Sequence, residues 1–174
     1  GALAGSAEWL ERVLELDAGE ARDLQGRLEA ARAAELLVFT RWVLVMTGFE
    51  KVLYGDPEAD LDAAWWDLVA RHQLVTPPDG RAKPGGAHDW AAKIHIAVAP
   101  VYYHTYLYGA IVAAQLRASL GTAAGGLVDR PDAGALLVSR LFAPGESVRW
   151  DRLVEQASGS PLSVAALERE VAAA

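Results

Sequence analysis

The chain has 174 residues, enough for one domain with a buried core, and 52% of them are hydrophobic. Its formal net charge of −7 argues against a nucleic-acid partner, because phosphate binding needs clustered Lys and Arg. The absence of cysteine excludes disulfides, thiolate metal ligands and a cysteine nucleophile. Ala and Leu are abundant and β-branched residues other than Val are few, so we expect an all-α fold, a multi-helix bundle forming one domain over residues 1–174.

The first half of the chain predicts three helices. Acids alternate with apolar residues over 8–16, which indicates a short amphipathic helix. A long helical pattern follows from about 18 to 54, charged at its start and almost wholly apolar at its end. Asp56-Pro57 is a helix-start signal, and the next helix carries Trp65 and Trp66, which we expect in the core.

The second half begins with a Pro- and Gly-rich loop over 76–87 and an expected extended segment over 94–99. Pro100 suits the first turn of a helix, which we expect to run to about residue 120 and stop at Gly121. Three shorter helices are predicted at about 132–142, 147–157 and 163–173, with Ser147 and Ser163 as N-caps.

One stretch stands out because residues 94–116 contain no Lys, Arg, Asp or Glu yet carry two histidines, four tyrosines and a glutamine. Three interpretations stay open. The stretch is an aromatic core helix whose hydroxyls are satisfied internally, a donor-rich site for an anion or oxyanion beside a helix N-terminus, or a membrane helix. The last is least favoured, because His, Tyr and Gln on several faces would each need a partner in lipid.

Two catalytic signatures are missing from the sequence. None of His72, His88, His95 and His104 belongs to the H-E-x-x-H pattern of zinc proteases, and no Gly-x-Ser-x-Gly elbow is present. We therefore expect no zinc site contained wholly within this chain.

Four segments together suggest a family. They are FEKVLYGDPEADLDAAWWDLVARHQ (49–73), WAAKIHI (90–96), PVYYHTYLYGAIVAAQL (100–116) and LFAPGESVRWDRLVEQASGSPLS (141–163). In this order they resemble the C-terminal part of zinc metallopeptidases of the angiotensin-converting-enzyme (peptidyl-dipeptidase A) type, related to oligoendopeptidase F and thimet oligopeptidase. The resemblance covers roughly residues 36–167. It implies a helical, groove-containing gluzincin-type peptidase, a hydrolase that cleaves peptides, of which this chain is the C-terminal fragment.

The resemblance also implies roles for individual residues. His95 corresponds to a histidine that hydrogen-bonds the substrate backbone, and Lys93 to a lysine that pairs with the substrate's C-terminal carboxylate. Tyr106 falls on the tyrosine that donates to the tetrahedral oxyanion, and Tyr103 on one that helps bind the carboxylate. Because His95 and Tyr106 are one residue farther apart than in the angiotensin-converting enzymes, Tyr102 and Tyr103 stay open as alternatives for the oxyanion role.

The implied cofactor is zinc in the full-length enzyme, with none bound to this chain alone, which we expect to be inactive. A peptide is the implied partner, and self-association through exposed groove surface is a further expectation. The alternative is a non-catalytic helical module that binds peptides or other proteins. Residues 1–9 lack the basic start and apolar run of a signal peptide, which favours a soluble, cytoplasmic protein.

Overall fold

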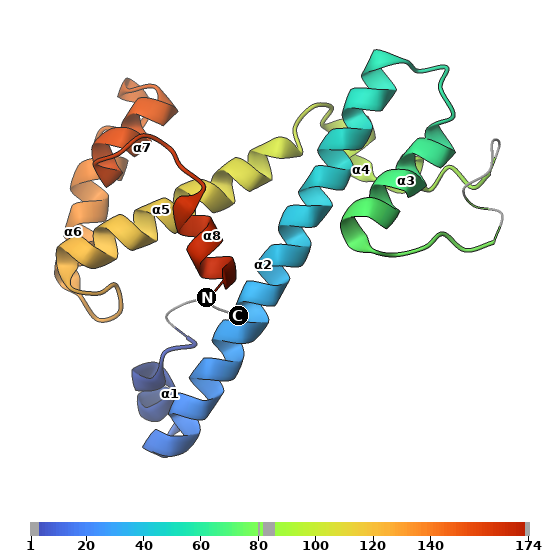
Figure 1. Ribbon diagram of the computed structural model, residues 1–174. Helices are drawn as coiled ribbons and strands as arrows, with labels where there is room; N and C mark the ends of the chain where they lie inside the picture. The colour runs from blue at the N-terminus through green and yellow to red at the C-terminus, as the bar shows by residue number, and fades with distance from the viewer. Residues whose placement is uncertain (1–3, 80, 82–85, 173–174) are drawn as a thin grey trace. The chain divides into compact units, whose positions relative to one another are not determined.

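The computed structural model describes residues 4–79, 81 and 86–172, and within these ranges it is all-α with no strand, which confirms the predicted fold class (Figure 1). The α-helices are α1 (Ala7–Leu14), α2 (Ala18–Gly55), α3 (Leu61–Gln73), α4 (Ile94–Val98), α5 (His104–Ala124), α6 (Pro131–Leu137), α7 (Trp150–Ser158) and α8 (Ala165–Ala172). Short 3-10 helices cover Asp89–Ala92 and Gly145–Ser147, and a π-helical turn, Val138–Phe142, continues α6. Over the described ranges, no helix combines the length and apolar character needed to cross a membrane.

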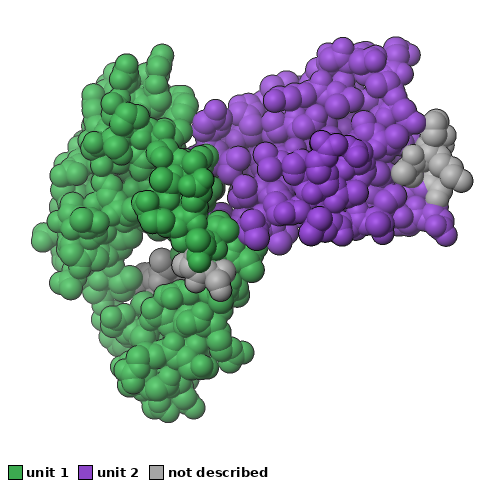
Figure 2. All heavy atoms as spheres, in the orientation of Figure 1, with its two compact units in different colours: residues 1–35, 109–174 green, residues 36–108 purple. Residues whose placement is uncertain are grey.

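Contacts divide the chain into two compact units, one made of residues 36–108 and the other of residues 1–35 and 109–174 (Figure 2). Both boundaries fall inside helices, because α2 and α5 each begin in one unit and continue into the other. A single domain over the whole chain stays a prediction.

The core of the 36–108 unit is built from one face of α2 against α3, the Asp89–Ala92 turn and α4. Phe49 is fully buried and makes edge-to-face contact with Trp65, with ring centroids 5.2 Å apart. Such aromatic pairs contribute about 0.5–1.5 kcal/mol beyond the area they bury. The buried core residues are Val45, Met46, Phe49, Trp65, Val69 and Ile96. Trp65 was expected in the core and lies there, whereas Trp66 is only partly buried at its edge.

Side chains fix both ends of α3. Asp60 caps its start, because its carboxylate accepts a hydrogen bond from the Ala63 N–H at 3.0 Å. At its end, Leu74 takes a left-handed backbone conformation (φ 58°), and the Arg41 guanidinium donates to the His72 carbonyl. Because Asp60 is the cap, α3 begins at Leu61, four residues after Pro57, where the sequence had suggested a helix start.

The other unit packs the later part of α5 against α6, the π-helical turn and α7. Leu116, Leu120 and Ala157 are its buried centre. Beside them, the Gln115 side chain is buried and hydrogen-bonds the segment 158–163, accepting from the Ser163 N–H at 2.8 Å. This polar contact fixes the segment that leads into α8.

Two predictions for the segment between α3 and α5 are wrong. Residues 94–98 form a helical turn and are not extended, because Ile96 turns inward to join the core. Pro100 does not begin a helix, because Val101 after it is left-handed (φ 56°) and α5 starts only at His104. Tyr102 and Tyr103 therefore precede α5, whereas Tyr106 lies in its first turn.

Predictions for the later helix ends are partly wrong. Gly121 lies within α5, which ends at Ala124 because Gly125 is the residue with a positive φ (66°). Ser147 caps no helix, since its hydroxyl donates to the Pro144 carbonyl and α7 begins at Trp150. Ser163 lies two residues before α8, which begins at Ala165, and its hydroxyl accepts a hydrogen bond from the Ala165 N–H at 3.2 Å. The predicted loop 76–87 falls partly outside the described residues, and its described part forms no regular element.

Candidate functional site

The candidate site lies in the 36–108 unit, where four predicted residues form one aromatic cluster. His95 on α4 contacts Tyr103 and Tyr106, with ring centroids 4.9 Å and 5.7 Å apart. Tyr103 and Tyr106 contact each other at 5.0 Å, and Tyr102 packs edge-to-face on Tyr106 at 5.7 Å. The turn between α4 and α5 folds these rings together, which sequence spacing alone did not establish.

A hydrogen bond joins the two residues predicted to act on the substrate carbonyl. His95 Nε2 lies 3.1 Å from the Tyr106 hydroxyl, and the direction of donation follows the tautomer of the imidazole. Tyr106 is 40% exposed and His95 is partly exposed, so a ligand can reach the pair. The imidazole and the phenol can each donate a hydrogen bond, so this accessible pair is suited to bind an acceptor oxygen of a ligand.

The three tyrosines differ in their surroundings. Tyr102 is 48% exposed, whereas Tyr103 is only partly exposed and packs against the core. Burial raises the pKa of the Tyr103 phenol above its ordinary 10.0, although a hydrogen bond with Trp42 acts in the opposite direction. Tyr103 therefore stays a neutral phenol, able to donate, throughout the physiological range. Of the three, Tyr106 is the one hydrogen-bonded to His95, which favours it over Tyr102 and Tyr103 as the donor to an oxyanion.

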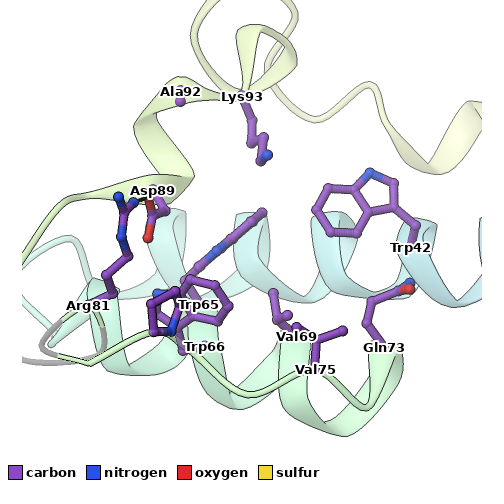
Figure 3. Close-up of a pocket in the computed structure, with 11 residues that line it drawn as sticks. Trp42, Trp65, Trp66, Val69, Gln73, Val75, Arg81, Asp89, Ala92 and Lys93 are labelled. Atoms are coloured by element: carbon purple, nitrogen blue, oxygen red, sulfur yellow. Dashed lines mark hydrogen bonds and ion pairs between the residues drawn. The ribbon is translucent and has the colours of Figure 1, made fainter.

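Lys93 points into a pocket of about 550 Å³, which His95 and Tyr106 do not line (Figure 3). Its ammonium lies 5.4 Å from the ring centroid of Trp42 and 5.9 Å from that of Trp65, within the range of cation–π attraction. Arg81 and Asp89 form an ion pair at the pocket's edge, so Lys93 leaves the lining with a net positive charge. A carboxylate is the complementary ligand for such a pocket.

Trp42 connects the two halves of the site and was missed from the sequence. It packs against the same core cluster as Tyr103, lowers the pKa of the Tyr103 phenol and carries the Lys93 ammonium over its ring. Its position in the apolar half of a long helix made it look like an ordinary core residue. Arg81 was missed as well, because an arginine in a Pro- and Gly-rich loop gives no local sign of a binding role.

The described residues do not fit a metal ion. Across 4–79, 81 and 86–172 there is no group of three His, Asp or Glu side chains placed to hold one, and the sequence has no cysteine. The zinc that the resemblance implies is therefore assigned to none of these residues.

No protein-family model, curated protein or solved structure matches the chain.

Proposed function

We propose that this chain provides the peptide-binding part of a zinc-dependent peptidase of the peptidyl-dipeptidase type. The observation that carries the proposal is the His95–Tyr106 hydrogen bond of 3.1 Å, formed at an exposed position beside a cationic pocket. Tyr106, oriented by His95, binds the carbonyl oxygen of a peptide bond, and Lys93 binds the carboxylate at the peptide's C-terminus.

The pair can form a short hydrogen-bond chain. When the imidazole carries its proton on Nε2, His95 donates to the Tyr106 oxygen, and the Tyr106 hydroxyl is then free to donate to the peptide carbonyl. As negative charge develops on that carbonyl oxygen, the Tyr106 hydrogen bond becomes charge-assisted and strengthens. The interaction thus stabilises the transition state more than the bound peptide, which is the requirement for catalysis.

The binding half of the proposal is tested on the chain itself by tryptophan fluorescence, since Trp42 and Trp65 lie beside the Lys93 ammonium. A tetrapeptide with a free C-terminal carboxylate should bind more tightly than its C-terminal amide. Lys93→Met should weaken binding of the free acid by about tenfold or more and abolish this preference. Lys51→Met, an exposed lysine on α2, is the matched control and should change neither. Equal affinity for acid and amide would refute the carboxylate assignment.

The catalytic half is tested by the coding sequence upstream of Gly1. An H-E-x-x-H segment followed by a downstream Glu supports the peptidase, and a complete reading frame without them favours a non-catalytic binding module. In an enzyme that contains both parts, Tyr106→Phe should lower turnover by about 10²–10³ while zinc content stays unchanged. Full activity of that variant would contradict the role given to Tyr106.

A further inference from the structure

A buried carboxylate lies outside the cluster and the pocket. Glu50, on α2, is only 4% exposed, and its Oε1 accepts a hydrogen bond from the backbone N–H of Val101 at 2.8 Å. Burying a carboxylate is unfavourable unless the hydrogen bond it makes compensates. Glu50 is thus held inside the unit to meet one backbone amide 51 residues away.

The residue that Glu50 holds has an unusual backbone. Val101 has φ of 56°, in the left-handed region that β-branched residues rarely adopt. Its side chain is 59% exposed, so packing of that side chain does not explain the conformation. The Glu50 hydrogen bond, by contrast, acts on the backbone of this residue directly.

The turn at Val101 sets the relative position of the two helices that carry the candidate site. It joins α4, which carries His95, to α5, which carries Tyr106. Directly after Val101, the Tyr102 carbonyl accepts hydrogen bonds from the Thr105 N–H at 3.0 Å and the Thr105 hydroxyl at 2.7 Å, which starts α5. A different backbone conformation at Val101 would redirect α5 and separate Tyr106 from His95.

We infer that Glu50 is a positioning residue that locks the left-handed turn at Val101 and so holds Tyr106 in hydrogen-bond contact with His95. The inference rests on the proposed function for its consequence in peptide binding. Its structural part, the dependence of the His95–Tyr106 contact on Glu50, is measurable without any peptide.

The test uses NMR of the Val101 amide and of the His95 imidazole nitrogens. Glu50→Gln keeps an acceptor oxygen and should retain both wild-type signals. Glu50→Leu should let the Val101 amide exchange at least about tenfold faster and move His95 Nε2 to its chemical shift in Tyr106→Phe. Met46→Ala, which opens a cavity in the same unit, is the control for general destabilisation and should leave the His95 shift unchanged.

Three results would overturn the inference. One is a wild-type Val101 amide that exchanges as fast as an exposed peptide amide, a measurement that stands even if Glu50→Leu does not fold. Another is a folded Glu50→Leu variant with the wild-type His95 shift, and the third is a loss of that shift in Met46→Ala. If Lys93→Met binds the free-acid peptide as well as the wild type does, the carboxylate assignment of the proposed function fails, while the His95 shifts still decide the role of Glu50.

Discussion

Replacing the buried amide of Gln115 with alanine should be one of the most destabilising changes in the chain. Gln115 is 6% exposed, and its amide nitrogen lies within 2.8–3.2 Å of four acceptors on residues 158–161. That nitrogen has two hydrogens and can satisfy two acceptors at a time, while the amide oxygen accepts from the Ser163 N–H. Gln115→Ala therefore removes three hydrogen bonds and leaves a backbone N–H without its acceptor.

The magnitude follows from that count. Each neutral hydrogen bond contributes about 1 kcal/mol net, so the loss of three lowers the free energy of unfolding by about 3 kcal/mol. The one buried methylene lost from Gln115 adds about 0.8 kcal/mol, and the side-chain entropy regained, of the order of 1 kcal/mol, offsets it. For a chain of this size, about 3 kcal/mol corresponds to a fall in Tm of about 6–12 °C.

The assay is thermal and urea unfolding followed by circular dichroism, with Gln156→Ala as the matched control. Gln156 is exposed on α7, so the same chemical change there should alter stability by less than about 0.5 kcal/mol. If the two variants unfold within about 0.5 kcal/mol of each other, the Gln115 hydrogen bonds do not carry the stability assigned to them.

Three further predictions concern single contacts. Leu74→Gly should raise the free energy of unfolding in urea by about 0.5–1 kcal/mol, because Leu74 has φ of 58°, which glycine adopts without strain, and is 79% exposed. A urea midpoint below that of the wild type would contradict this. The Arg149 guanidinium lowers the pKa of Asp151 from 3.8 to about 2, so its contribution to stability is present above pH 3.8 and is lost as the pH falls towards 2. In acid unfolding, the deficit of Asp151→Asn relative to wild type should therefore shrink across that window, and a constant deficit would count against the ion pair. Arg117 and Glu170 form a partly buried, bidentate ion pair with N···O distances of 2.9 Å and 2.6 Å. A double-mutant cycle should give a coupling free energy of about 1–2 kcal/mol, and a value below about 0.3 kcal/mol would show that the pair does not contribute to stability.

The long helices could be predicted from sequence, and the turns between them could not. Helix α2 ends within one residue of the predicted 18–54 pattern, because Ala, Leu, Glu and Arg favour a helix and no Pro interrupts them over that length. The turn at Val101 depends on a carboxylate 51 residues away, so no local pattern reports it. Pro100 was misassigned for this reason, since it obeys a local rule that a distant contact overrides.

The candidate site, too, could be predicted from sequence only in part. His95, Tyr103 and Tyr106 could be selected from sequence because an uncharged run with polar tips is unusual, and the structure brings their rings together. Lys93 could be selected too, but its aromatic surroundings could not, since Trp42 and Trp65 come from two other helices. Their roles in binding a peptide stay predictions.

The interruption of one unit by the other has a consequence for synthesis on the ribosome. Residues 36–108 are contiguous, so that unit can fold once residue 108 has emerged, and α2 can form with it. The other unit must wait for residues 109–174 before its first 35 residues find their partners. The early part of α2 therefore emerges with α1, whose Ala7 N–H donates to the Gln25 side chain, but lacks the Arg32–Glu170 ion pair until α8 has been made.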